Sequence, residues 1–441
     1  MSGAEVDAII APATPLGRSA LAIVRMDGPG ARALAEEWSG RKLEERRATR
    51  VRLADRDGVI DDAVITLFVA PRSFTGNDLV EISLHGSLAV VERLLRAAGD
   101  AGVRLAGAGE FTERAVLNGK LDLVQAEAIG DLIASRTAAQ SKLALANLEG
   151  ALSREAKAAR EELVAILSRF EAALDFAEEG YTFIETAEAL QRLGHLAGNL
   201  RGIEETFRRG RATAGGITLV ILGRPNAGKS TLLNALCGED RAIVTAIPGT
   251  TRDLVRETIE LGGLPVMVVD TAGLRDTSDE VEGIGVARAR EAATRAEMVV
   301  YLIDASAGET AEDRESLARH ADALVVYTKT DLAPAPEGTF GVSVTSGEGL
   351  PALLERLGTE VREKYAVPEG GGAVVNERQR RALEEARIAV EAASEAVQRG
   401  ESEEVVAVDL RDGARALGLL TGEITTEELL REIFANFCIG K

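Results

Sequence analysis

The chain has 441 residues, of which 46% are hydrophobic, and its formal net charge is -20. This length predicts two to four domains, and the acidic balance means that a polyanionic partner would have to use a local basic patch. Two cysteines, three histidines without metal-ligand spacing and no long apolar run argue against a disulfide framework, a structural zinc site and a membrane partner, and favour a cytoplasmic protein.

The first region, residues 1–118, alternates short apolar runs with turns. Breaks such as Asp27-Gly28-Pro29-Gly30 separate runs at 8–10, 20–24, 64–69 and 79–84. Short runs bounded by glycine and proline are typical of strands and turns. The region therefore predicts a small α+β domain.

Helical spacing dominates residues 119–212 and returns in residues 372–441. In the first segment Leu163, Ile166 and Phe170 fall on one helical face, and in the second Leu383 and Val390 do so. Both segments predict long helices of a bundle. Near the C-terminus, the run from residue 424 to 429 matches a hydrophobic staple and capping box, which predicts Thr425 as the N-cap of a last helix.

Residues 213–371 alternate between strand and helix patterns. Apolar runs at 217–222, 265–269, 298–303 and 323–327 predict buried parallel strands of a doubly wound sheet. The predicted fold class is therefore α/β plus α+β and all-α: an N-terminal α+β domain, a discontinuous helical domain, and an α/β domain inserted between the helical halves.

A phosphate loop opens the inserted domain. Residues 223–230 read Gly-Arg-Pro-Asn-Ala-Gly-Lys-Ser, a complete G-x-x-x-x-G-K-[ST] motif between a predicted strand and helix. Backbone N–H groups of such a loop surround phosphates at a helix N-terminus. Lys229 is expected to reach the β- and γ-phosphates, and Ser230 to hold Mg²⁺. The expected nucleotide contacts are Asn226, Ala227, Gly228, Lys229, Ser230 and Thr231.

Later motifs favour GTP over ATP. Asp270-Thr271-Ala272-Gly273 matches D-x-x-G, in which the Asp reaches Mg²⁺ through water and the Gly meets the γ-phosphate, and Thr251 is placed to coordinate Mg²⁺. Thr328-Lys329-Thr330-Asp331 resembles the guanine reader N-K-x-D, whose carboxylate accepts hydrogen bonds from donors that adenine lacks. Ser343-Val344-Thr345 is placed to contact the base oxygen. Two departures stand out: Val344 replaces Ala, and Thr328 replaces an Asn that makes more hydrogen bonds, which predicts modest guanine affinity.

The residue that orients the attacking water is not in its usual place. Ras-like proteins use a Gln after D-x-x-G, whereas Leu274 stands here and cannot bind water. The acidic segment 276–282 follows, and Glu282 is the candidate. The alternative is a solvated acidic loop.

Signatures outside these motifs are more specific. They are Ala-Pro-Ala-Thr-Pro-Leu-Gly-Arg at 11–18, Gly-Glu-Phe-Thr at 109–112, Leu-Asn-Gly-Lys-Leu-Asp at 117–122 and Phe-Cys-Ile-Gly-Lys at 437–441. With the nucleotide motifs, they make the whole chain resemble the MnmE (TrmE) family of tRNA-modification GTPases. Its domains would be an N-terminal folate-binding and dimerisation domain (1–118), a helical domain in two halves (119–212 and 372–441) and a Ras-like G domain (213–371).

The resemblance implies a specific chemistry. A homodimer would join an MnmG-like FAD protein in a heterotetramer and modify position 5 of the wobble uridine of certain tRNAs, giving aminomethyl or carboxymethylaminomethyl groups. A reduced folate, 5-formyltetrahydrofolate or methylene-tetrahydrofolate, would carry the one-carbon unit. Family folate contacts fall on Arg25, Glu81, Lys120 and Lys441. Read alone, each of these is an ordinary surface charge.

The resemblance also assigns hydrolytic residues. Potassium would bind Asn226 with oxygens of Thr245, Ile247 and Thr250, wrapped by the loop Thr245-Ala246-Ile247-Pro248-Gly249-Thr250. Glu282 would orient the water, in agreement with the inference from Leu274. Cys438 would be catalytic, with a small buried hydrophobic residue as the alternative.

Two other functions stay open at this stage. One is a ribosome-assembly or signalling GTPase switch without modification chemistry. Such switches usually carry a basic RNA-binding domain, which the acidic composition and the terminal Cys-Ile-Gly-Lys argue against. The other is a folate-dependent one-carbon transferase with a regulatory G domain, which is a variant of the tRNA-modifying GTPase and does not exclude it.

Overall fold

The computed structural model describes residues 7–176, 183–238, 256–270, 296–368, 370–435 and 437–440. The chain divides into two compact units, each assembled from segments that are distant in the sequence. Unit 1 comprises 1–130, 156–164 and 411–441, and unit 2 comprises 131–155 and 165–410. The described residues include no helix with the length and apolar character needed to cross a lipid bilayer.

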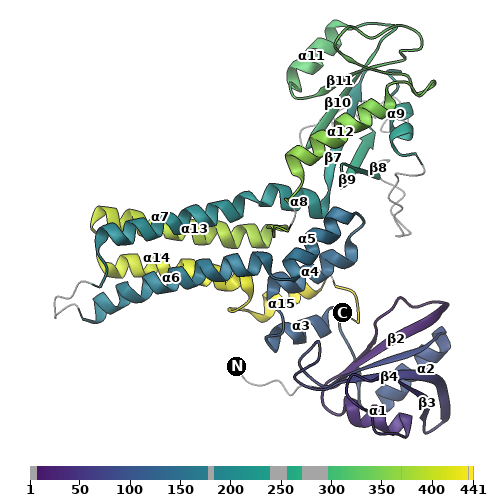
Figure 1. Ribbon diagram of the computed structural model, residues 1–441, viewed down its shortest axis with the longest axis vertical. Helices are drawn as coiled ribbons and strands as arrows, with labels where there is room; N and C mark the ends of the chain where they lie inside the picture. The colour runs from purple at the N-terminus through teal and green to yellow at the C-terminus, as the bar shows by residue number, and fades with distance from the viewer. Residues whose placement is uncertain are drawn as a thin grey trace, which may run out of the picture. The chain divides into compact units, whose positions relative to one another are not determined.

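Unit 1 contains a six-stranded sheet in the order β3-β4-β5-β2-β1-β6, antiparallel except for the β1–β6 pair. Its strands are β1 (Ile9–Pro12), β2 (Ser19–Asp27), β3 (Thr49–Asp55), β4 (Gly58–Phe68), β5 (Leu79–Gly86) and β6 (Arg104–Leu105). Helices α1 (Ala31–Ser39) and α2 (Leu88–Asp100) pack against this sheet (Figure 1).

The two faces of the sheet differ because side chains alternate along a strand. In β2, Val24 and Met26 are buried in the core with α1 and α2, whereas Leu21 and Arg25 lie on the opposite face. Helix α3 (Glu110–Leu117) covers one end of that opposite face, where Phe111 packs against Ile9 and Leu79. The remainder of the face includes Arg25 and Glu81, whose side chains are partly exposed.

The remaining helices of unit 1 place the C-terminal residues. Leu123 of α4 (Leu123–Ala134) packs with Leu430 and Phe434 of α15 (Glu427–Phe434). The predicted cap of α15 is wrong by one residue: Thr426 is the N-cap, and its hydroxyl accepts a hydrogen bond from the Leu429 N–H at 3.2 Å. The third residue of the helix is then a leucine, so no capping box forms.

Further helices precede and follow the inserted sheet in the sequence. They are α5 (Ala138–Leu148), α6 (Ala151–Asp175), α7 (Thr186–Glu205), α8 (Phe207–Gly215), α13 (Glu377–Arg399) and α14 (Glu403–Thr421), of which α6 and α14 include residues of both units. Helices α7 and α13, which flank the α/β region in the sequence, lie side by side, and Arg387 donates to Glu204 between them at 2.8 Å.

The segment that directly follows the inserted region is fastened to the helices. The Asn147 side chain donates to the Ala373 carbonyl at 3.0 Å and accepts from the Ala373 N–H at 3.3 Å. The Val374 N–H donates to the Thr206 hydroxyl at 3.0 Å. Gly210 of α8 packs so closely on Val374 that an added Cβ would lie 2.2 Å from its carbonyl oxygen.

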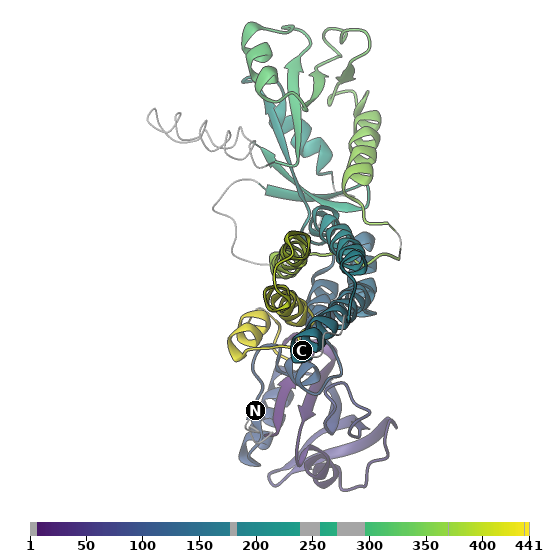
Figure 2. The ribbon, with the colours of Figure 1, turned by 90° about the vertical axis from the view of Figure 1, so that its left-hand side faces the viewer.

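The inserted sheet has the order β12-β11-β10-β7-β9-β8 and is parallel except for β8. Its strands are β7 (Ile217–Gly223), β8 (Arg256–Leu261), β9 (Leu264–Asp270), β10 (Met298–Asp304), β11 (Leu324–Thr328) and β12 (Phe340–Val342). Helices α9 (Lys229–Leu236) and α12 (Leu350–Tyr365) share a core with β7, and α11 (Ala311–Arg319) packs beside Tyr301 of β10 (Figure 2). Coverage of both faces explains the continuous apolar runs of the central strands.

Candidate functional site

The phosphate loop joins the central strand β7 to helix α9. Gly228 adopts φ 89°, a conformation that favours glycine, and α9 begins at the next residue. Gly223, with φ 144°, packs so tightly that an added Cβ would lie 2.5 Å from the Leu302 carbonyl oxygen. Helix N-terminal N–H groups and the helix dipole attract phosphate. The loop therefore fits a nucleotide phosphate chain.

Lys229 is the only basic residue of the first turn of α9. It is 8% exposed, and its Nζ donates to the Gly223 and Arg224 carbonyl oxygens at 2.8 Å each. Its ammonium thus lies within the loop itself. Ser230 and Thr231 follow and are exposed, as is Asn226 with φ 62°, whereas Ala227 is buried.

Thr328 connects the base-reading segment to the phosphate loop. It ends β11, is 4% exposed, and its Oγ1 donates to the Ala227 carbonyl at 2.8 Å. A hydroxyl has a single proton to donate, and this contact or the longer one to Ile303 O at 3.3 Å uses it. Thr328 therefore has no donor left for guanine, which is the physical basis for the modest affinity expected from this departure.

Asp331 is exposed, and one oxygen of its carboxylate is held by a hydrogen bond. Its Oδ1 accepts a hydrogen bond from the Ser343 hydroxyl at 2.7 Å, and Ser343 is fully buried. Lys329, at φ 58°, donates to Asp304 at 2.6 Å. Val344 packs partly against the core, and Thr345 is exposed. The carboxylate is thus oriented without being covered, as a reader of guanine donors requires.

The second phosphate element is described only in part. Strand β9 ends at Asp270, paired with Ile221 of β7, so this residue is delivered beside the start of the phosphate loop. The other predicted residues lie outside the described residues, and their roles stay predictions: Thr245, Ala246, Ile247, Pro248, Gly249, Thr250, Thr251, Thr271, Ala272, Gly273, Glu282 and Lys441.

A second cluster lies on the face of the unit 1 sheet that is opposite α1 and α2. Ala11, Arg25, Glu81 and Thr66 stand opposite one another on four adjacent strands. Arg25 donates through Nε to Oε1 of Glu81 at 2.9 Å, and its Nη2 lies 2.9 Å from the same oxygen. The two predicted folate residues therefore form an ion pair through Oε1 of Glu81.

The C-terminal residues lie against this cluster. Arg25 Nη1 donates to the Gly440 carbonyl at 3.5 Å, and Gly440, at φ 91°, leaves no room for a Cβ beside Pro12. Ile439 pairs with Ala108, and the Gly109 N–H donates to the Cys438 carbonyl at 3.4 Å. Cys438 itself is exposed, so its reading as a small buried hydrophobic residue is wrong.

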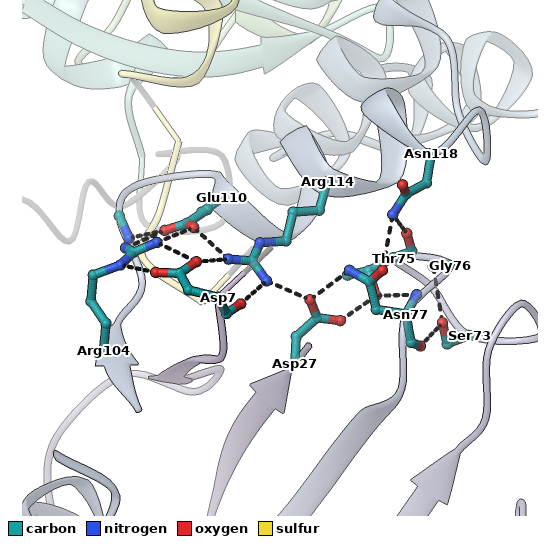
Figure 3. A network of polar contacts seen from close by, with 11 residues as sticks. Asp7, Asp27, Ser73, Thr75, Gly76, Asn77, Arg104, Glu110, Arg114 and Asn118 are labelled. Atoms are coloured by element: carbon teal, nitrogen blue, oxygen red, sulfur yellow. Dashed lines mark hydrogen bonds and ion pairs between the residues drawn. The ribbon is translucent and has the colours of Figure 1, made fainter. Parts of the chain in front are cut away.

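A buried polar network borders the same face. Asp27, two residues beyond Arg25 on β2, is fully buried and accepts from Arg114 and the Asn77 side chain at 3.0 Å each, and also from the Thr75 hydroxyl (Figure 3). Asn118 donates to the Thr75 carbonyl at 2.7 Å. These bonds fix the segment 73–77 against α3.

Lys120 is attached to the same segment. Its Nζ donates to the Pro71 carbonyl at 2.9 Å, and a Cβ on Gly76 would lie 3.5 Å from its Cγ. The sequence placed Asn118 and Lys120 in one signature but gave no signal for Asp27 or Arg114. Asp27 precedes Gly28-Pro29-Gly30 and therefore reads as a turn residue.

Arginines set the charge state of the outer carboxylates in this network. Hydrogen bonds from Arg104 lower the pKa of Asp7. Burial raises the pKa of Glu110, but hydrogen bonds from Arg104, Gly107 and Arg114 outweigh it, so the net pKa is lowered. A lowered pKa means that the stabilisation is present above the carboxyl pKa of the unfolded chain and is lost as pH falls through the folded value.

We expect Arg114→Met to destabilise unit 1 by about 3–5 kcal/mol, because it leaves the buried Asp27 carboxylate without its cation. Arg104→Met is the matched control. Its partners Asp7 and Glu110 keep 51% and 15% of their side-chain surface exposed, so water replaces part of the lost contact and the loss should be smaller. Urea unfolding of both variants measures the difference, and equal losses would contradict the assignment.

Comparisons with known proteins cover both units. Residues 8–120 match the family model described as GTP-binding protein TrmE N-terminus, and residues 123–438 match the MnmE helical domain. The chain is 40% identical to a tRNA modification GTPase MnmE of Koribacter versatilis and 43% identical to one of Thermus thermophilus, each over 99% of both chains. It is also similar to the crystal structure of Aquifex aeolicus Era bound to GDP and AlF4-, at 24% identity over 39% of this chain and 66% of that chain, with a TM-score of 0.28.

Proposed function

The chain belongs to the MnmE family of tRNA modification GTPases and is a GTP hydrolase acting in tRNA modification, and we propose that it modifies position 5 of the wobble uridine of certain tRNAs. In this reaction it works with an MnmG-like FAD protein and adds aminomethyl or carboxymethylaminomethyl groups. The observation that carries the proposal is the contact of residues 437–440 with Arg25 and Gly109, because it joins two separate family signatures in one site.

The G domain binds GTP through the phosphate loop and Asp331. Ser230, in the first turn of α9, and Thr251 would hold Mg²⁺, with Asp270 as the acidic residue of that site. The ion would supply positive charge that offsets the negative charge of the phosphate oxygens. Lys229 positions the phosphates, and Glu282 orients the attacking water in place of the missing glutamine.

A reduced folate, 5-formyltetrahydrofolate or methylene-tetrahydrofolate, binds at the Arg25–Glu81 row. The second oxygen of Glu81 accepts from donors of the pterin ring, and Lys120 and Lys441 attract the glutamate tail. Bound folate supplies the one-carbon unit. Cys438 is exposed, lies two residues before the Gly440 that contacts Arg25, and is the chain's candidate nucleophile.

Assembly involves both a second copy and the flavoprotein. The N-terminal domains form the homodimer, and two flavoprotein chains complete a heterotetramer. Exposed Leu16 and Leu21, 59% and 63% accessible, support an apolar contact on this domain. The proposed domains are 1–118 for folate and dimerisation, 119–212 with 372–441 for the helical part, and 213–371 for GTP.

Mass spectrometry of tRNA nucleosides tests the modification. Cells that lack the protein should lose the 5-substituted wobble uridine, and the wild-type chain but not Asp270→Ala should restore it. An unchanged nucleoside profile would favour the assembly-switch alternative, and ribosome profiles would then be informative.

Potassium binding gives a separate prediction. We expect GTP hydrolysis to be faster in K⁺ than in Na⁺, because K⁺ held by Asn226, Thr245, Ile247 and Thr250 offsets the charge that develops on the phosphates. Asn226→Ala should remove the difference, because it deletes the exposed amide ligand. Hydrolysis rates in matched KCl and NaCl measure it, and equal wild-type rates would count against the ion.

A further inference from the structure

A short segment of unit 1 reverses the charge balance of the chain. The whole protein has 51 basic and 71 acidic residues, but residues 41–56 contain seven basic side chains against three acidic ones. All seven are exposed. We call them the basic edge: Arg41, Lys42, Arg46, Arg47, Arg50, Arg52 and Arg56.

The basic edge follows the outer strand of the unit 1 sheet. Strand β3 pairs with β4 on one side, and among the described residues no strand pairs with its other side. The segment before β3 continues this edge, because Glu45 bridges Leu67. Arg50 and Arg52 alternate with buried Val51 and Leu53, so they project from one face about 7 Å apart. The seven residues of β3 span roughly 23 Å. Arg50 and Arg52 lie on β3, and the other five basic residues lie on the segments directly before and after it.

Part of this charge is uncompensated. Arg47 pairs with Glu44 at 2.8 Å, Arg50 with Asp62 at 3.3 Å, and Arg56 with Asp100 at 2.6 Å. Arg41, Lys42 and Arg52 form no close ion pair in the part of the chain that the structure describes, although Lys42 helps to lower the pKa of Glu36 and Asp62 stands across from Arg52 on β4. All three side chains are exposed.

Basic residues at this edge also have a purely structural role, because charged side chains on an edge strand, lysine above all, prevent pairing with other sheets. The two arginines of β3 already supply such charge. Residues 41–56 carry seven basic side chains against three acidic ones, which is more charge than that role needs and complements a polyanion.

We propose that the basic edge binds the phosphate backbone of the tRNA substrate. This rests on the proposed function, which makes tRNA the substrate. Guanidinium groups match phosphate oxygens in geometry as well as charge. Contacts of this kind fix the position of the nucleic acid and do not read its bases. The exposed Leu21 lies on β2, three strands from β3, which separates the basic edge from the apolar contact proposed for the homodimer.

The test uses the full-length protein and an unmodified tRNA transcript with a wobble uridine. The variant Arg41→Gln/Lys42→Gln/Arg52→Gln removes the three exposed charges that form no close ion pair. The control Arg96→Gln/Arg209→Gln/Arg356→Gln removes three exposed basic groups elsewhere, with the same change in net charge. Fluorescence anisotropy gives the association constant over a series of NaCl concentrations, without nucleotide.

We expect the basic-edge variant to bind tRNA at least tenfold more weakly than wild type. The slope of log K against log[NaCl] should fall by about 2–3, because each lost phosphate contact removes roughly 0.7–0.9. The loss should be the same for different tRNAs, and the control should stay close to wild type. Unfolding midpoints of both variants check that the fold is intact.

Three outcomes would overturn the proposal. Equal losses in the two variants would show that only net charge matters. An unchanged slope in the basic-edge variant would show that these residues do not contact phosphate. Normal tRNA binding with lost binding of the flavoprotein would make the edge a protein interface. If wild type binds tRNA only with the flavoprotein, the same comparison is made on that complex. Failure of wild type to restore the wobble nucleoside would instead contradict the proposed function.

Discussion

Asp331→Asn is expected to weaken GTP binding by a hundredfold or more and to favour xanthosine triphosphate. The carboxylate accepts two guanine N–H groups, and each such charged hydrogen bond is worth about 1.5–3 kcal/mol. An amide presents a donor where guanine also donates, whereas xanthine carries an oxygen there. Because Thr328 spends its only donor within the protein, Asp331 bears most of the discrimination. Displacement of a fluorescent guanine nucleotide measures both affinities.

Ser343→Ala is the control for this result. It removes the hydroxyl that holds Asp331 Oδ1 but leaves the negative charge. The expected loss of GTP affinity is several-fold, in keeping with about 1 kcal/mol for one hydrogen bond. If Asp331→Asn bound GTP as tightly as wild type, the guanine assignment of this segment would be wrong.

Lys229→Met is expected to slow GTP hydrolysis by roughly 10²–10³-fold. Removal of one group that stabilises transition-state charge typically costs this much. Lys229 also ties the Gly223 and Arg224 carbonyl oxygens together, so its loss loosens the loop that positions the phosphates. Single-turnover hydrolysis at saturating GTP measures the chemical step apart from nucleotide affinity.

Lys329→Met is the control that separates an effect on the rate of hydrolysis from an effect on nucleotide affinity. Lys329 pairs with Asp304 at 2.6 Å near the base-reading segment. Lys329→Met should therefore lower affinity while it leaves the single-turnover rate near wild type. A Lys229→Met enzyme that hydrolyses GTP at the wild-type rate would refute the role given to the loop lysine.

The sequence predicts the strands whose apolar residues form continuous runs, and it does not predict short or half-exposed strands. The central strands of the inserted sheet are continuous apolar runs because helices cover both faces, and all four predicted runs overlap observed strands. Strand β3 was missed because arginines alternate with Val51 and Leu53 on an edge that is half exposed. Strand β12 has three residues, too few to produce a periodic signal.

The site residues also differ in whether a local sequence pattern predicts them. The phosphate loop and Asp331 follow from spacing, because their chemistry lies within one strand and the turn after it. The Asp27–Arg114 pair joins residues 87 positions apart in the sequence, so no local pattern reveals it. The shift of the last cap from Thr425 to Thr426 shows a smaller limit, since adjacent threonines satisfy almost the same pattern and only the backbone conformation distinguishes them.

The fastening of residues 373 and 374 to Asn147 and Thr206 has a mechanical consequence. Residues 373 and 374 directly follow the proposed nucleotide domain, and their hydrogen bonds hold this exit against α5 and the start of α8. A linker held in this way leaves the domain less freedom to reorient than an unattached linker of the same length.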